Sequence, residues 1–253
     1  MDKNQFLLET IYDQVQNDFE DNVRSLSEIS IPLSEKLIRF KYSLLYSHPL
    51  RTLKPGNLYF LGINPKGENN IDYELETYTS WVKADVEYNS LDSNYENWGG
   101  ILQNRCKDIL NFVIDELRLD INYKDIIFTN FNFFRSNNVR ELLYDFEIQI
   151  DSCWKYHKQL LEIVLPKIII CNGNSNNDSG LDSPYRFLRD NYKISNEKTY
   201  HLYNKFLLKK TVICIPEIGE ILLIGIPHLS RFPPNVNFYN KLKSWIQDFN
   251  VNS

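Results

Sequence analysis

Four short apolar segments, each bounded by Gly, Pro or Asn, recur along this chain of 253 residues. They are 58-LYFLGINP, 126-IIFTNFNFF, 167-KIIICNGN and 221-ILLIGIPHL. Near-continuous apolar runs of this length are typical of strands buried on both faces, as in a parallel sheet. The sequence therefore predicts a parallel sheet with helices packed on both of its sides.

Helical spacing of apolar residues occupies much of the remaining chain. It predicts helices over residues 4–29, 34–47, 97–118, 139–164 (as two helices), 184–192 and 237–249. The segment 206–218 reads as an extra strand that turns at Gly219 into the fourth apolar run, with Lys209 and Lys210 on its exposed face. Alternating strands and helices predict an α/β fold: a three-layer α/β/α sandwich with a central, mainly four-stranded parallel sheet and one extra antiparallel strand. We expect one domain over 1–253, with 1–56 as a helical extension packed on it.

Charge and cysteine content exclude several classes of function. The formal net charge of −5 argues against a protein that coats DNA without specificity, which would need a basic surface. The four cysteines lie far apart and form no CxxC pair, which excludes a zinc ribbon and disfavours an iron–sulfur cluster. The N-terminus lacks the apolar core of a signal peptide, and no run of 18 apolar residues exists. We therefore expect a cytoplasmic protein with no membrane contact.

Neutral amides dominate the segments that follow the four predicted strands. They include Asn64, Asn130, Asn132 and Asn172, together with a single histidine, His228. The chain has no phosphate-binding GxxxxGK[ST], no dinucleotide-binding GxGxxG and no GxSxG nucleophile motif. Amides offer paired donors and acceptors, which suit the edge of a nucleobase better than they suit proton transfer.

The motifs at these strand ends resemble those of the uracil-DNA glycosylase superfamily. GINPKG (62–67) is similar to its first motif, closest to the forms in the mismatch-specific and single-strand-selective branches. PHLSRF (227–232) is similar to its second motif, His-Pro-Ser followed by a wedge residue. Between them, 153-CWKYHKQLLEIVLPKIIICNG matches a helix and strand of the family, and 126-IIFTNFNFFRSN stands where the base-reading Asn is expected. Two positions depart from the pattern, with Leu229 in place of the usual Pro and Lys66 in place of Gly or Tyr.

The resemblance implies a role for each matching residue. Asn64 would position the attacking water by its carbonyl oxygen, and His228 would stabilise the departing base. Asn130 is the preferred base-reading residue, and Asn132 is its close rival. Ile63 would border the base, and Trp98 is a candidate for the aromatic ring that stacks on it.

The same resemblance implies a DNA-contacting loop after the fourth strand. Leu229 and Phe232 would supply an apolar wedge, while Ser230, Arg231 and the more distant Lys66 would contact phosphates. The alternative is a loop that packs Phe232 into the core.

These expectations combine into a monofunctional DNA glycosylase. It would flip a modified or mismatched base from single- or double-stranded DNA and hydrolyse its N-glycosidic bond as a monomer, without a metal or organic cofactor. Because Lys66 borders the pocket, one alternative is a glycosylase of phage-type hypermodified cytosine in anti-phage defence. Because the charge is acidic and the second motif is altered, another alternative is a catalytically silent nucleic-acid-binding module.

Overall fold

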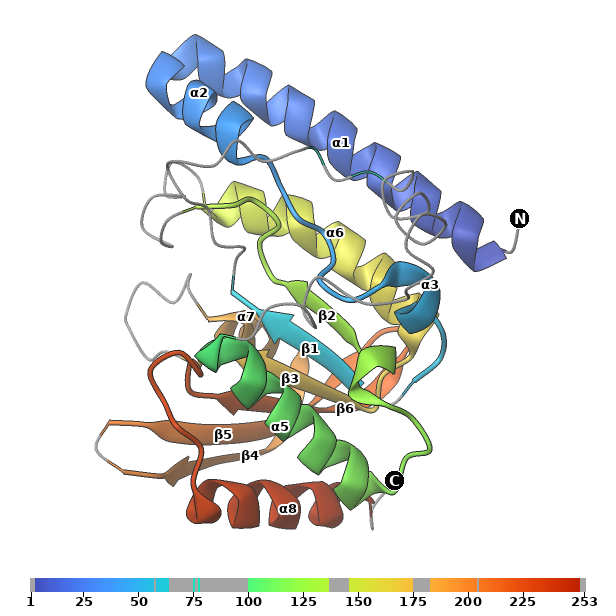
Figure 1. Cartoon of the computed structure of the whole chain (residues 1–253), viewed down its shortest axis with the longest axis vertical. Helices are drawn as coiled ribbons and strands as arrows, with labels where there is room; N and C mark the ends of the chain where they lie inside the picture. Colours follow the sequence, from blue (N-terminus) through green and yellow to red (C-terminus); the bar gives the residue numbers. More distant parts are fainter. Residues whose placement is uncertain are drawn as a thin grey trace.

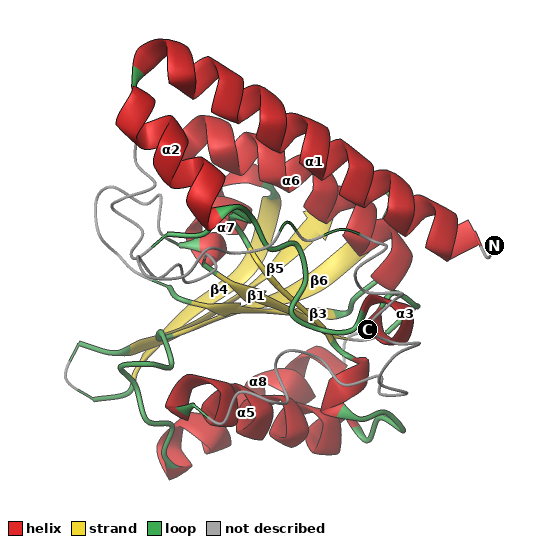
Figure 2. Ribbon diagram, turned by 45° about the horizontal axis from the view of Figure 1, so that its top comes forward, coloured by secondary structure: helices red, strands yellow, loops and turns green. Residues whose placement is uncertain are grey.

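A computed structural model describes residues 3–56, 58–63, 75, 77, 100–136, 146–174, 183–203 and 205–250. Within these ranges a single mixed sheet lies between two layers of helices (Figures 1 and 2). The strands are β1 (Leu58–Gly62), β2 (Ile127–Asn130), β3 (Ile168–Asn172), β4 (Lys193–His201), β5 (Leu207–Ile215) and β6 (Gly219–Ile226). The helices are α1 (Lys3–Ile29), α2 (Ile31–Phe40), α3 (Pro49–Thr52), α5 (Ile101–Leu117), the short 3-10 helix η1 (Tyr123–Asp125), α6 (Phe146–Val164), α7 (Pro184–Asn191) and α8 (Val236–Asn250). The predicted three-layer α/β/α sandwich is confirmed.

The strand order is β2-β1-β3-β6-β5-β4, in which the first four strands are parallel. β5 and β4 extend this sheet in antiparallel pairing. The sheet thus has six strands, with two antiparallel strands where the sequence predicted one. β4 escaped prediction because its side chains, KISNEKTYH, are almost all exposed and carry no apolar pattern. It forms by pairing with β5, a contact that the local sequence does not reveal.

Both faces of the parallel strands are buried, as the continuous apolar runs predicted. Along β1, Tyr59 and Leu61 join a core cluster with α1, α6 and α7, while Leu58 and Phe60 join a second cluster with α5 and α8. The same alternation holds along β3. Because successive side chains of a strand point to opposite faces, each strand contributes to both clusters. Leu8, Ile11 and Val15 of α1 belong to the first cluster, so this helix is part of the domain core.

The second helix is shorter at its C-terminal end than predicted. The prediction over 34–47 is wrong beyond Phe40, where α2 ends. The following residues instead run beside β2, where the Ser43 N–H donates to the Phe133 carbonyl (2.8 Å) and the Tyr46 N–H donates to the Phe128 carbonyl (2.9 Å). This segment satisfies part of the outer edge of β2, whose backbone groups would otherwise lack partners on that side.

Among the described residues, no helix combines the length and the apolar character needed to cross a membrane.

Candidate functional site

The carboxyl ends of the four parallel strands bring the candidate residues to one edge of the sheet. Gly62 pairs with Asn130 at the ends of β1 and β2, and Asn172 pairs with Ile226 at the ends of β3 and β6. Ile63 directly follows β1, and His228 is the second residue after the end of β6. Ligands of open α/β sheets bind outside this edge. Neighbouring strands lie about 4.8 Å apart, so β2 and β6, three steps apart in the strand order, are separated by roughly 14 Å.

Asn130 closes β2 with a side chain that is buried against the backbone of β1. Only 6% of the residue is exposed. A Cβ atom placed on Gly62 would lie 2.1 Å from Asn130 Oδ1, so glycine is needed there for the amide to occupy its position. Among the described residues, none forms a hydrogen bond with this side-chain amide. A largely buried amide without such a partner is the kind of group that a ligand can satisfy.

Asn132 has a different role from the one predicted for it as a base-binding rival. It is fully buried, and its Oδ1 accepts a hydrogen bond from the Phe134 N–H (2.9 Å). Its own N–H donates to the Ile63 carbonyl (2.9 Å). β2 ends at Asn130, so Asn132 lies beyond the strand. We therefore correct Asn132 to a turn residue that joins the ends of β1 and β2.

A buried histidine, His157, forms a hydrogen bond with the backbone of this turn. His157 Nε2 lies 3.1 Å from the Phe131 carbonyl, and its Nδ1 lies 2.8 Å from Tyr59 Oη. A carbonyl only accepts, so Nε2 carries the proton and Nδ1 accepts from the Tyr59 hydroxyl. Burial lowers the pKa of His157 to about 4, and hydrogen bonds to the backbone of Phe131 and Asn130 oppose this shift. The ring is therefore neutral at pH 7. The pair carries no local sequence signal, because its members lie 98 residues apart and form no motif.

His228 lies at the opposite end of the edge with its ring orientation held by the next turn. The Ser230 N–H donates to His228 Nδ1 (3.4 Å), and Ser230 Oγ lies 2.7 Å from the same nitrogen. Since Nδ1 accepts, the neutral ring carries its proton on Nε2, which is then a hydrogen-bond donor. Burial lowers the pKa of His228, and the charge of Arg231 lowers it further. The ring is thus a neutral donor at pH 7.

Two side chains hold the loop that carries His228. Asn172 Oδ1 accepts from the Leu229 N–H (3.0 Å), and Arg105 Nη1 of α5 donates to the Leu229 carbonyl (2.6 Å). Arg105 was not predicted, because it lies on a helix distant in sequence and belongs to no motif.

The predicted DNA contacts of Leu229 and Phe232 are corrected. Both residues are 0% exposed and belong to the core cluster with α5 and α8. The Phe232 ring packs against Tyr203, Phe206 and Phe238. An apolar wedge must reach solvent to enter a base stack. The alternative weighed for this loop, with Phe232 in the core, is the one observed.

The remaining predicted residues divide into two groups. Ser230 and Arg231 are exposed and Ile63 is half-buried, so their predicted contacts with DNA or base stay predictions. Asn64, Lys66 and Trp98 lie outside the described residues. Within the described part of the chain, no cluster of three or more His, Cys, Asp or Glu side chains is arranged to hold a metal ion.

Comparison with known proteins gives no family assignment. No protein-family model matches the chain, and no curated protein matches it significantly.

Proposed function

We propose that this protein is a DNA glycosylase that hydrolyses the N-glycosidic bond of a base flipped out of DNA. The observation that carries the proposal is the pair of polar side chains at the carboxyl edge: the Asn130 amide, unused by the described residues, and the His228 ring with its donor on Nε2. An amide that reads a base edge and a donor that meets a base oxygen are the two groups such a pocket needs. The resemblance of GINPKG and PHLSRF to the uracil-DNA glycosylase superfamily adds the water-positioning Asn64.

The proposed reaction needs no strong base. The water oxygen bonds to C1′ of the sugar, the N-glycosidic bond breaks, and its electron pair leaves with the base, while the water's proton passes to solvent or to the base. The transition state resembles an oxocarbenium ion, as in other glycoside hydrolysis, so a positioned water is an adequate nucleophile. A neutral His228 donating from Nε2 would stabilise the negative charge on the departing base. Its lowered pKa suits this role, because the ring stays a fixed donor rather than a variable charge near pH 7.

The test measures base release from a panel of oligonucleotides. Single- and double-stranded DNA carrying uracil, mismatched thymine or hypermodified cytosine is incubated with the protein and then cleaved with alkali at abasic sites. We expect release of at least one base, a loss of about 10²–10³ in rate for His228→Ala, and a similar or larger loss for Asn64→Ala. His201→Ala is the matched control, because His201 is exposed on β4 and lies outside the motifs.

The same panel separates the alternatives. Preference for hypermodified cytosine would indicate a role in anti-phage defence. Release of uracil or mismatched thymine would indicate a role in DNA repair. DNA binding without release of any base would overturn the enzyme in favour of a binding module. Equal rates for wild type, His228→Ala and Asn64→Ala would also overturn the proposed mechanism.

A further inference from the structure

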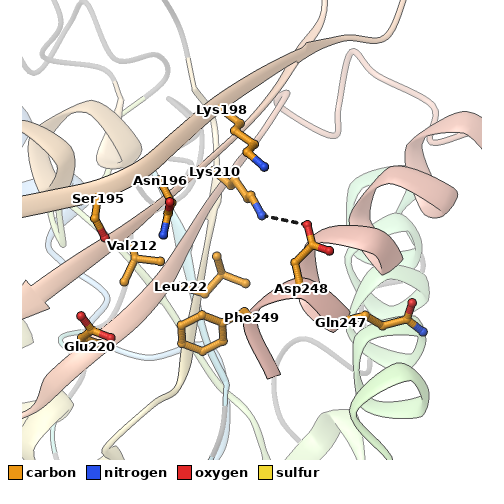
Figure 3. A pocket seen from close by; sticks show the side chains of 10 residues that line it. All are labelled: Ser195, Asn196, Lys198, Lys210, Val212, Glu220, Leu222, Gln247, Asp248 and Phe249. Atoms are coloured by element: carbon orange, nitrogen blue, oxygen red, sulfur yellow. Dashed lines mark hydrogen bonds and ion pairs between the residues drawn. The ribbon is translucent and has the colours of Figure 1, made fainter. Parts of the chain in front are cut away.

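A second site lies at the other end of β6 from the candidate glycosylase site. A cavity of about 490 Å³ opens between the last turn of α8 and the three outer strands β4, β5 and β6 (Figure 3). Leu222 lines the cavity, whereas His228 lies six residues further along the chain, roughly 20 Å away at the rise of an extended strand. None of the residues singled out for base excision lines this cavity.

The cavity contains a buried ammonium group. Lys210 was predicted on an exposed face, but its side chain is only 7% exposed. Its Nζ lies 3.5 Å from Asp248 Oδ2 and 5.6 Å from the centroid of the Trp245 ring. The Asp248 side chain is 53% exposed, so its charge is largely solvated. Lys210 therefore has a long contact with a well-hydrated carboxylate, which compensates its buried charge poorly.

Neighbouring charges of both signs act on the Lys210 ammonium. Burial lowers the pKa of Lys210, and the charges of Lys198 and Lys241 lower it further, while Asp248 opposes the shift. Lys198 reaches the cavity from β4, and Figure 3 shows its side chain beside that of Lys210. An anion placed between these two lysines would offset their repulsion and the burial of Lys210.

Apolar side chains complete the lining. Val212 and Leu222 lie on the same face of the sheet as Lys210, the Phe249 ring faces them from α8, and the Glu220 carboxylate stands at one end. Small-molecule sites commonly combine apolar walls with a few polar groups that fix orientation. The cavity thus has two lysines for an anionic group, a ring surface for an apolar body and an acceptor for a donor group.

We propose that this cavity binds a small organic anion that carries a ring. Its phosphate or carboxylate lies between Lys198 Nζ and Lys210 Nζ, and its ring packs on Leu222 and Phe249. A donor group on the far side of the ring faces Glu220. This site does not depend on the proposed glycosylase activity.

The test is isothermal titration calorimetry of the full chain with simple probes. We expect phenyl phosphate or benzoate to bind at least tenfold tighter than inorganic phosphate or benzyl alcohol, since only the first two present both the anion and the ring. The stronger of the two identifies the preferred anionic group. Lys198→Gln, an exposed position whose substitution leaves the core intact, should weaken binding by about fivefold or more. Lys193→Gln, on the same exposed strand but outside the cavity lining, should leave binding unchanged.

A second variant tests the buried group. Lys210→Gln should abolish binding, and circular dichroism of this variant checks that it folds. If it does not fold, the comparison of Lys198→Gln with Lys193→Gln still decides the proposal. Absence of binding of both ring anions at about 10 mM, or equal affinity in the wild type and Lys198→Gln, would overturn it.

Discussion

Tyr59 and His157 lie 98 residues apart in the sequence and meet in the core, where Tyr59 Oη lies 2.8 Å from His157 Nδ1. Through its other nitrogen, His157 holds the Phe131 carbonyl, in the turn that directly follows Asn130. A strand, a helix and a site-bearing turn are thus connected by one buried imidazole. Such fully satisfied polar groups stabilise one arrangement of a core, because leaving any of them unpaired is costly.

Breaking this network should destabilise the fold in proportion to the groups left unpaired. Tyr59→Phe leaves His157 Nδ1 buried without a hydrogen-bond donor and should cost about 1–3 kcal/mol in the free energy of unfolding. His157→Leu leaves both the Tyr59 hydroxyl and the Phe131 carbonyl without a partner, so it should lower the free energy of unfolding by more. Urea unfolding measures both. Tyr239→Phe, at a half-buried tyrosine that packs on Phe112, should change the value by less than about 0.5 kcal/mol. A Tyr59→Phe protein as stable as wild type would contradict the hydrogen bond.

The same histidine should make stability depend on pH. Burial lowers the folded-state pKa of His157 from 6.5 to about 4. Between these values the unfolded chain binds more protons than the folded one, so the free energy of unfolding falls as pH falls from 6.5 to 4. The separation corresponds to about 3 kcal/mol.

Urea unfolding at pH 7 and pH 4.5 tests this dependence. His157→Gln keeps an amide donor for the Phe131 carbonyl but removes the titrating ring, so its loss of stability on acidification should be smaller than that of wild type. His228, whose pKa is also lowered, contributes in the same direction to both proteins and cancels in the comparison. Equal acid sensitivity in the two proteins would count against a neutral, buried His157.

Gly62→Ala should impair the site more than the fold. The added methyl would lie 2.1 Å from Asn130 Oδ1, and the amide must rotate away to admit it. Because a displacement of about 1 Å in a positioning group can cost 10²-fold in rate, we expect a large loss of base release with an unfolding free energy within about 1 kcal/mol of wild type.

Gly56→Ala is the control for this substitution. Its nearest neighbour would be the Lys54 carbonyl oxygen at 3.7 Å, an ordinary contact. Full activity of Gly62→Ala, in a protein that releases bases, would show that the position of the Asn130 amide does not matter for the reaction.

Leu229→Ala and Phe232→Ala should act through stability rather than DNA contact. Both side chains are fully buried, so truncation should cost about 2–5 kcal/mol. Arg231→Ala, between them but exposed, should change stability by less than about 0.5 kcal/mol. Thermal and urea unfolding measure these effects. Variants of Leu229 or Phe232 with wild-type stability but weakened DNA binding would support the predicted wedge and contradict a purely structural role for these residues.

Periodicity was enough to predict the central layer of this protein. Runs such as LYFLG and KIIIC indicate burial on both faces, because a strand with one exposed face would alternate apolar and polar residues. The ends of these runs also placed Asn130 and His228 at one edge, since parallel strands end on the same side. The polar strand β4 lacked this signal and depended on its partner β5.

Side-chain environment, in contrast, depended on contacts between distant segments. Leu229 and Phe232 lie in a motif that suggested exposure, yet three aromatic rings from the β4–β5 connection and from α8 pack against Phe232. Lys210 was predicted to be exposed, but Trp245 and Asp248 of α8 contact it in the folded chain. The local sequence indicates which residues prefer to be buried. Which of them are buried depends on where the helices pack, and this packing forms only when the whole chain folds.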